Sequence, residues 1–327
     1  MKFVKGSLPA MIDALEQGRK ILKKAEIEQS GLESELILSA AIRKPREFIY
    51  THPEYALSRF EERDFTNFIK RRAKRMPLAY ISGFKEFYDS AFFVNKNVLI
   101  PRPETEELVD LALEEIKKIQ KSGIKNMDII DVGAGSGAII ISILKSLKDS
   151  RFKIPRPRQG EAEGGQVSSF IAIDSSKRAL AIAQENANRL GINEQIQFLN
   201  GNLLQLYLQR LNAKDSRYKI QDTRFKLILA NLPYLTTFEM KSLQPEVRFE
   251  PRQALDGGKD GLDVYRVFFE QLAKLQNTPF TAICEIAPDQ KNKLLKIAKA
   301  SLPQSATKFF NDNSCRTRFA AIKSRPR

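Results

Sequence analysis

Residues 231–234 combine side chains that are suited to holding a flat NH2 group. They are Asn231, Leu232, Pro233 and Tyr234. The Asn231 amide carries an acceptor oxygen and a donor NH2 group. Pro233 fixes its own φ and keeps Leu232 extended, so the Leu232 carbonyl can serve as a second acceptor, and Tyr234 adds an aromatic face. We predict that these residues are catalytic and bind the substrate. Taken alone, a buried strand ending in a proline turn explains them equally well.

A glycine-rich turn earlier in the chain has the context of a cofactor-binding loop. An apolar strand at 128–132 precedes it and a helix at 138–147 follows it. Glycines let the backbone approach a ligand at a helix N-terminus, although the Gly-x-Gly-x-Gly spacing is one residue tighter than the dinucleotide fingerprint. The residues that we expect to contact a cofactor here are Asp131, Gly133, Ala134, Gly135, Ser136 and Gly137.

Polar residues also end the next two predicted strands. Asp174 ends one of them, and Asn202 and Leu203 follow the other. The Asp174 carboxylate can accept both ribose hydroxyls of an adenosine cofactor, and it can also cap the helix that follows it. Ligands of parallel sheets lie outside the carboxyl ends of the strands, so we expect the glycine turn, Asp174, Asn202 and Asn231 to meet in one crevice.

The order of predicted elements indicates an α/β fold. Strands alternate with helices after residue 102, which is typical of a doubly wound, mostly parallel sheet, whereas residues 8–75 have helical periodicity. We predict a helical docking domain at 1–76, a β-hairpin linker at 77–101 with its turn at 95–97, and a catalytic domain at 102–327. The predicted strands lie at 128–132, 170–174, 196–199, 227–230 and 281–286, with two more between 306 and 323. We interpret the polar stretch at 151–168 as an inserted surface loop.

Composition narrows the function classes. The 327-residue chain is 42% hydrophobic, which supports a sizeable core, but no apolar run reaches the roughly 20 residues that span a bilayer. Residues 1–5 lead into no long apolar segment, so we expect no signal peptide and a cytoplasmic monomer without membrane contact. One histidine and two distant cysteines argue against a metal site or a histidine base.

The net charge of +15 suggests an anionic partner such as RNA or the ribosome. A generally basic proteome would also produce this charge. The densest basic run, at 70–75, is explained equally well by a solvated helix end and by phosphate contacts.

Together these motifs resemble S-adenosylmethionine-dependent methyltransferases that act on a planar nitrogen, and more narrowly the release-factor glutamine N5-methyltransferase family. The resemblance covers nearly the whole chain. It rests also on the stretches 80–83, 86–87, 99–106, 250–251, 254–258 and 285–290. The chain departs from the family where Leu232 replaces the first proline of Asn-Pro-Pro-Tyr, and in the insertion at 151–168.

The resemblance implies a seven-stranded Rossmann-like sheet, S-adenosylmethionine as methyl donor with S-adenosylhomocysteine as product, and no metal. It implies that the substrate is the glutamine of the Gly-Gly-Gln motif of peptide-chain release factors. The Asn231 oxygen and the Leu232 carbonyl would accept from the glutamine NH2, and Tyr234 would pack on its plane. Further substrate contacts are expected at the mouth of the site, from Arg102, Pro103 and Glu104.

Two alternatives remain open. Adenine-N6 methyltransferases of RNA or DNA use a similar Asn-x-Pro-Tyr sequence to hold a flipped base, and a charge of +15 suits RNA. The helical domain that precedes the catalytic core and the stretch at 101–106 argue against that class. The second alternative is a protein that binds an adenosine cofactor, transfers no methyl group and only docks a partner.

Overall fold

The structure is a computed structural model, and it divides into two compact units. One unit comprises Met1–Phe84 with Leu243–Phe249, and the other comprises Lys85–Ser242 with Glu250–Arg327. The residues that the structure describes are 10–122, 124, 126–149, 166–211, 225–275 and 278–324.

The first unit is helical, as predicted. Its helices are α1 (Met11–Lys24), α2 (Ser30–Ile42), α3 (Arg46–Thr51), α4 (Arg59–Ala73) and α5 (Leu78–Ser82). A capping box starts α4: the Ser58 hydroxyl accepts from the Glu61 backbone N–H, and the Glu61 carboxylate accepts from the Ser58 N–H. A Cβ added to Gly18 of α1 would lie 2.6 Å from the Ser34 Oγ and 2.7 Å from Phe65. Helix α1 therefore packs closely on α2 and α4.

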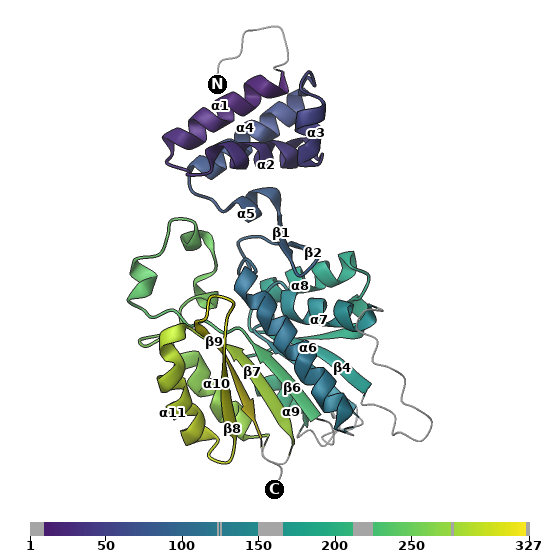
Figure 1. Ribbon diagram of the computed structural model, residues 1–327, viewed down its shortest axis with the longest axis vertical. Helices are drawn as coiled ribbons and strands as arrows, with labels where there is room; N and C mark the ends of the chain where they lie inside the picture. Colours follow the sequence, from purple (N-terminus) through teal and green to yellow (C-terminus); the bar gives the residue numbers. More distant parts are fainter. Residues whose placement is uncertain are drawn as a thin grey trace. The chain divides into compact units, whose positions relative to one another are not determined.

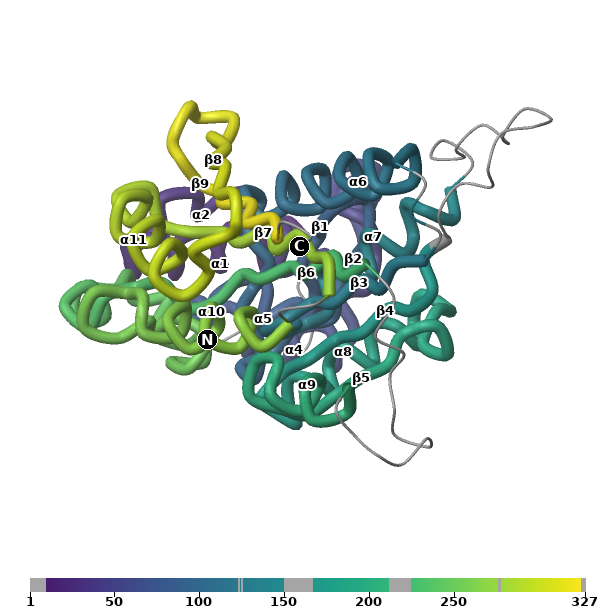
Figure 2. The backbone as a smooth tube through the Cα atoms, turned by 90° about the horizontal axis from the view of Figure 1, so that it is seen from below, coloured from purple at the N-terminus to yellow at the C-terminus, as the bar shows by residue number. Residues whose placement is uncertain are grey.

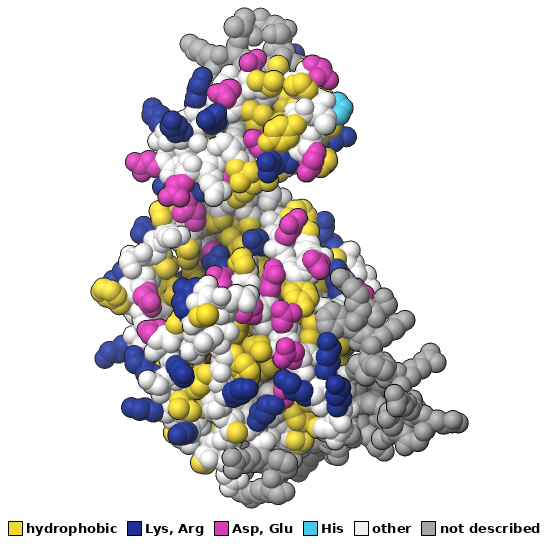
Figure 3. All heavy atoms as spheres, in the orientation of Figure 1, with side chains coloured by type: hydrophobic (Ala, Val, Ile, Leu, Met, Phe, Trp, Pro, Cys, Tyr) yellow, Lys and Arg dark blue, Asp and Glu magenta, His cyan; other side chains and the backbone are white. Residues whose placement is uncertain are grey.

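The basic run at 70–75 is partly occupied by ion pairs inside this unit. Arg72 is 7% exposed and donates to the Glu33 carboxylate and, at 3.0 Å, to Glu246. Arg75 donates to the same Glu246 oxygen at 3.2 Å. These arginines therefore hold Leu243–Phe249 to the helices instead of forming a bare phosphate-binding patch. On the face seen in Figure 3, Lys and Arg side chains lie among Asp and Glu side chains.

A two-stranded hairpin is formed by β1 (Phe84–Phe87) and β2 (Ser90–Phe93), and all of it except Phe84 belongs to the second unit. Its turn is at Tyr88 and Asp89, which have φ of +46° and +57°. The prediction that the turn lies at 95–97 is wrong. Asn95 instead makes a local turn after β2, because its side chain accepts from the Asn97 N–H at 2.9 Å.

The main sheet has seven strands in the order β5-β4-β3-β6-β7-β9-β8, which confirms the predicted fold class (Figure 1). Its strands are β3 (Asn126–Val132), β4 (Gln166–Asp174), β5 (Ile196–Asn200), β6 (Phe225–Ala230), β7 (Phe280–Glu285), β8 (Ala306–Asn311) and β9 (Thr317–Lys323). The first five are parallel, and β9 pairs antiparallel with β7 and β8. The chain order reverses between β3 and β6, which is where a doubly wound sheet opens a ligand crevice.

Helices cover both faces of this sheet. They are α6 (Glu106–Lys121), α7 (Ala138–Lys148), α8 (Lys177–Arg189), α9 (Gln205–Leu211), α10 (Asp263–Ala273) and α11 (Lys291–Ser301). Ile129 packs in the core under α6 and α7, whereas its neighbour Ile130 packs in the core under α9 and α10. Figure 2 shows α6 and α9 on opposite sides of the strands. Burial on both faces explains why the central strands are almost continuously apolar. Within the described ranges, no helix is both long and apolar enough to cross a membrane.

The predicted insertion at 151–168 ends earlier than expected, because residues 166–168 already belong to β4. Residues 151–165 lie outside the described part of the chain. Asn126 pairs with Gln166 at the start of β4, so the strand is longer at its beginning than its apolar run suggests.

A buried ion pair joins β3 to β6. Lys226 and Asp128 are register partners, both are 0% exposed, and their charged atoms lie 2.7 Å apart. Ser169 of β4 also donates to Asp128, at 2.6 Å. The pair therefore fixes the register of the two strands that lead to Asp131 and Asn231.

Replacing Lys226 by Met removes the cation that compensates the buried Asp128 carboxylate. We expect the free energy of unfolding, measured in urea, to fall by about 3–5 kcal/mol. The double variant Asp128→Leu/Lys226→Met removes both charges and should recover most of that loss. A double variant as unstable as the single one would contradict this account.

Candidate active site

A cavity of about 220 Å³ opens at the carboxyl ends of the parallel strands. It brings together predicted residues that lie far apart in the sequence. Those that line it are Gly133, Gly135, Asp174, Asn202, Leu203, Asn231, Leu232 and Pro233. The other predicted site residues are not among those that line it: Asp131, Ala134, Ser136, Gly137, Tyr234, Arg102, Pro103 and Glu104.

The glycine turn brings the two main motifs into contact. A Cβ added to Gly133 would lie 3.3 Å from the Leu232 side chain, and the φ of Gly133 is +78°. Gly137 has another role: its Cβ would lie 2.9 Å from Ile141 and 3.2 Å from Ala183 of α8. Gly133 therefore allows the approach of the 231–234 segment, and Gly137 allows two helices to pack closely.

The Asp174 carboxylate is held at the cavity wall by backbone donors. One oxygen accepts from the Gly135 N–H at 2.9 Å, and the other accepts from the Ser176 N–H at 2.8 Å. Burial raises the pKa of Asp174. The prediction that Asp174 caps the next helix is wrong, because Ser176 is the N-cap of α8 and accepts from the Ala179 N–H. Each Asp174 oxygen can still accept a second hydrogen bond from a ligand.

Asp131 is fully buried two residues before Gly133. The backbone N–H of Ile140 in α7 faces its carboxyl group, although neither oxygen makes a bond with full hydrogen-bond geometry to a described residue. Burial raises its pKa to about 7 and the neighbouring Asp174 adds to that rise, while the Ile140 N–H opposes it. Asp131 does not line the cavity, so it lies behind the glycine turn as a buried acid with a weak partner.

Asn231 ends β6 and is held by a chain of side-chain hydrogen bonds. Its Nδ2 donates to the Thr105 Oγ1 at 3.1 Å, and Thr105 donates to the Glu285 Oε2 at 2.7 Å. Sequence reasoning missed Thr105 and Glu285. The sequence pattern that identified Asp131, an acidic residue near the end of an apolar strand, would also have identified Glu285.

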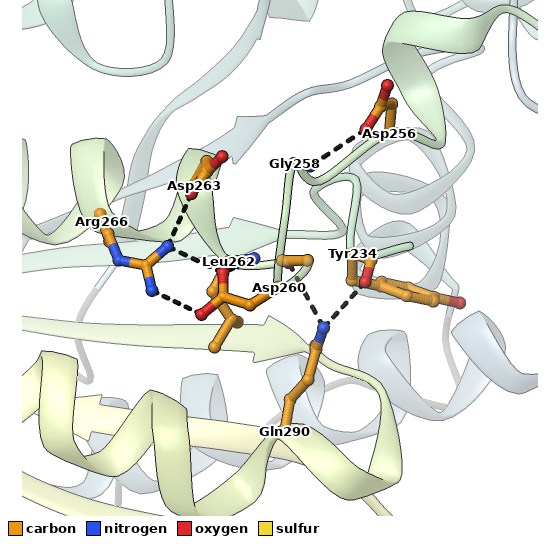
Figure 4. Close-up of polar contacts among 9 residues, drawn as sticks. Tyr234, Asp256, Gly258, Asp260, Leu262, Asp263, Arg266 and Gln290 are labelled. Atoms are coloured by element: carbon orange, nitrogen blue, oxygen red, sulfur yellow. Dashed lines mark hydrogen bonds and ion pairs between the residues drawn. The ribbon is translucent and has the colours of Figure 1, made fainter. Parts of the chain in front are cut away.

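The backbone of Tyr234 is anchored by Gln290 and by the glycine loop at 257–261. Gln290 donates through one nitrogen to the Tyr234 carbonyl at 2.8 Å and to the Gly261 carbonyl at 3.3 Å (Figure 4). Burial raises the pKa of Tyr234 to about 12, with Glu285 adding to it, so the phenol stays neutral and offers its ring face. Asp260 closes the same loop by pairing with Arg266 of α10.

The residues expected at the mouth of the site are organised by a second buried acid, Glu250. Its oxygens accept from the Arg102 guanidinium at 2.5 Å and from the Ile100 N–H at 3.0 Å. Pro103 and Glu104 start the short 3-10 turn Pro103–Thr105 that leads into α6. This turn delivers Thr105 to Asn231, so the 101–106 stretch has a structural role at the site.

Asn186 of α8 is another residue that the sequence did not reveal. Its side chain donates to the backbone carbonyls of Phe93 and Ser136 at 3.0 Å and 2.9 Å, and accepts from the Phe93 N–H at 2.7 Å. It therefore ties β2 to the glycine turn. Among the described residues, no group of three or more His, Cys, Asp or Glu side chains could hold a metal ion.

Comparisons with known proteins agree with this architecture. Residues 13–83 match the PrmC N-terminal domain, and residues 124–300 match a methyltransferase domain. A release factor glutamine methyltransferase of Dictyoglomus turgidum is 34% identical over 291 residues, covering 89% of this chain and 90% of the relative. The enzyme of that name from Caulobacter vibrioides is 32% identical over 292 residues, covering 89% of each. The hMettl16 catalytic domain, solved in complex with MAT2A 3'UTR hairpin 1, shares the fold: its TM-score is 0.50 at 11% identity, covering 88% of this chain and 90% of that one.

The sheet, the glycine turn and the matching domain define an S-adenosylmethionine-dependent methyltransferase. More narrowly, the identity and coverage of the relatives show that the chain belongs to the release factor glutamine methyltransferase family.

The loop glycines allow a direct test of how Tyr234 is positioned. In Gly261→Ala the new methyl group would overlap the Tyr234 carbonyl and the Gln290 amide, and φ is +76°. Gly191→Ala is the matched control, since φ is +68° and nothing lies within 4 Å. We expect Gly191→Ala to lose only about 1–2 kcal/mol of unfolding free energy through backbone strain, and to keep methyl transfer. Gly261→Ala should lose more stability and most of its turnover; equal effects of the two variants would refute this role.

Proposed function

We propose that this protein methylates the side-chain amide nitrogen of the glutamine in the Gly-Gly-Gln motif of release factors, with S-adenosylmethionine as donor, and so supports translation termination. The observation that carries the proposal is the placement of Asn231 in the cavity wall with its NH2 group already bonded to Thr105. The Asn231 oxygen is then the group that remains to accept a bond from a substrate amide.

The cavity suits the proposed cofactor. S-adenosylmethionine supplies an electrophilic methyl group on a cationic sulfur. Asp174 would accept the ribose hydroxyls, and Asn202 and Leu203 would flank the adenine. Asp131 would add a negative charge behind the glycine turn, which suits the positive charge of such a ligand, and Gly133 and Gly135 in the cavity wall leave room for it. We further propose that Asn231 contacts both cofactor and substrate.

The 231–234 segment would orient a weak nucleophile. The lone pair of an amide nitrogen is delocalised into its carbonyl, so the nitrogen must be held in one orientation toward the methyl group to react. The Asn231 oxygen and the Leu232 carbonyl would accept its two N–H bonds, and Tyr234 would pack on its plane. The Leu232 carbonyl belongs to the backbone, so this acceptor is present whether residue 232 is proline or leucine. Pro233 still restricts the backbone conformation of Leu232. Positioning and fixed dipoles then supply much of the rate.

We also propose roles for the segments that would bring the substrate to the cavity. Residues 1–76 would dock the release factor, since residues 13–83 match the PrmC N-terminal domain, and 77–101 would link them to the catalytic domain at 102–327. Arg102, Pro103 and Glu104 would contact the substrate loop. We propose a cytoplasmic monomer whose net charge of +15 favours proximity to ribosomal RNA.

Asp174→Ala should weaken cofactor binding because it removes the acceptors for the ribose. Hydrogen bonds to a charged group contribute about 1.5–3 kcal/mol, so we expect roughly a 10- to 100-fold rise in the dissociation constant measured by calorimetry. Glu185→Ala, on the exposed face of α8, is the control and should bind normally. Unchanged affinity in Asp174→Ala would remove this residue from the cofactor site.

The proposed function is tested by offering radiolabelled S-adenosylmethionine with a release factor and ribosomal RNA side by side. We expect label in the release factor, lost when the glutamine of its Gly-Gly-Gln motif is replaced. Label in RNA would instead establish an adenine methyltransferase. Cofactor binding without label in either substrate would indicate a catalytically silent module.

In the same assay, Asn231→Ala should retain most of the cofactor affinity, because the other proposed cofactor contacts remain, but lose turnover by about 100-fold or more, as expected for removal of one fixed polar group in an active site. Asn313→Ala, in the loop between β8 and β9, serves as the control and should be fully active. Strong turnover by Asn231→Ala would exclude it as the amide acceptor.

A further inference from the structure

Three segments of the sheet unit meet in one hydrogen-bonded chain behind the cavity. Asn231 comes from the end of β6, Thr105 from the turn before α6, and Glu285 from the end of β7. The Asn231 Nδ2 donates to the Thr105 Oγ1 at 3.1 Å, which donates to the Glu285 Oε2 at 2.7 Å. Thr105 and Glu285 are 4% and 1% exposed, so bulk water does not replace these bonds.

The chemistry of the middle residue gives this chain a direction. A threonine hydroxyl has a single proton to donate. An ionised Glu285 can only accept, so the Thr105 proton points to it and the Thr105 oxygen is left to accept from Asn231. The Asn231 NH2 group must then face Thr105, and its oxygen faces away from Thr105.

We propose that Thr105 and ionised Glu285 are positioning residues that set the polarity of the Asn231 amide, so that its oxygen is presented to the substrate NH2 group. This inference rests on the proposed function, because it assumes that Asn231 accepts from an amide. Neither residue touches the substrate; both act through Asn231.

Protonation of Glu285 would reverse the chain. A neutral carboxyl group can donate to Thr105, which frees the Thr105 proton for the Asn231 oxygen. The amide would then turn its NH2 group toward the substrate NH2, donor against donor. The methylating form is therefore the one with Glu285 charged, and turnover should rise with pH as this carboxyl group ionises.

The surroundings of Glu285 place that ionisation near neutral pH. Burial raises its pKa to about 7, while the bond from Thr105 and the charge of Arg318 on β9 lower it and Glu104 raises it. The Tyr234 phenol, in the segment after β6, also donates toward the carboxyl group and lowers its pKa. Tyr265 of α10 donates its hydroxyl to the Glu285 backbone carbonyl, which holds the strand end in place.

The test compares pH profiles of kcat at saturating S-adenosylmethionine, so that ionisation of Asp131 in the free cofactor site does not enter. The wild-type kcat should rise through about pH 7. Glu285→Gln has no carboxyl group to ionise, so it should lose that rise. Its neutral amide can also turn its NH2 group toward Thr105 and permit the reversed chain, so turnover at pH 8 should be at least about tenfold slower. Thr105→Val should behave alike, whereas Thr105→Ser keeps the hydroxyl and should retain both the rate and the rise. All three should bind the cofactor normally.

A matched control exists at the other end of the same strand. Thr281 at the start of β7 donates to the buried Glu115 of α6 at 3.1 Å. Thr281→Val therefore removes the same kind of buried bond away from the cavity, whereas Glu115→Gln also weakens the ion pair of Glu115 with Lys323 at 2.6 Å. Both variants should keep the wild-type kcat and its pH dependence. If they reduce kcat as much as Thr105→Val and Glu285→Gln do, the effect is general destabilisation and the proposal is overturned.

A measurement without substrate separates this inference from the proposed function. The ¹⁵N side-chain signal of Asn231, assigned by its loss in Asn231→Ala, should shift with pH in the wild type and not in Glu285→Gln. If no release factor is methylated, the proposed function fails while this titration still decides on the chain. If methylation occurs but Glu285→Gln keeps both the pH profile and the amide titration, the positioning role is wrong and the proposed function stands.

Discussion

The structure depends on one constraint: the central strands are buried on both faces, so polar groups at their carboxyl ends must find partners within the fold or in a ligand. Four neighbouring strands carry such groups at this edge: Asp174 and Glu285 end β4 and β7, Asp131 is the last residue but one of β3, and Asn231 directly follows β6. Asp174 is held by backbone N–H groups, and Glu285 by Thr105. Asp131 is fully buried, and the backbone N–H of Ile140 faces its carboxyl group.

The loops around this rim pack closely on the backbone of the 231–234 segment. Gly257 and Gly261 allow the backbone to pack directly on the Pro233 and Tyr234 carbonyls, where a side chain would collide. Gln290 then spans two of these backbone segments with one amide nitrogen. The proposed acceptor at residue 232 is its backbone carbonyl, and the surrounding loop holds this part of the backbone. A change of side chain at Leu232 should therefore leave the position of that carbonyl unchanged.

Local patterns in the sequence were enough for the strands, the helical unit and the convergence of Asp174 with Asn231, because each depends on hydrophobic periodicity and strand direction. They misplaced the hairpin turn, since Asn95 and Asn97 have turn chemistry but Tyr88 and Asp89 adopt the left-handed conformation. They also missed the pairing of Thr105 with Glu285. Those residues are 180 positions apart, and only the folded sheet shows that they meet.

The position of β8 at the border of the sheet has a consequence for how the molecule meets other chains. Among the described strands it has a neighbour on one side only, so its other side presents unpaired backbone groups that could template a foreign strand. Two lysine ammonium groups lie over aromatic rings of β8. The Lys308 Nζ is 4.9 Å from the centroid of the Phe310 ring, and the Nζ of Lys291, from α11, is 5.5 Å from the centroid of the Phe309 ring. Bringing a second chain alongside would strip water from these ammonium groups, which discourages aggregation through this border.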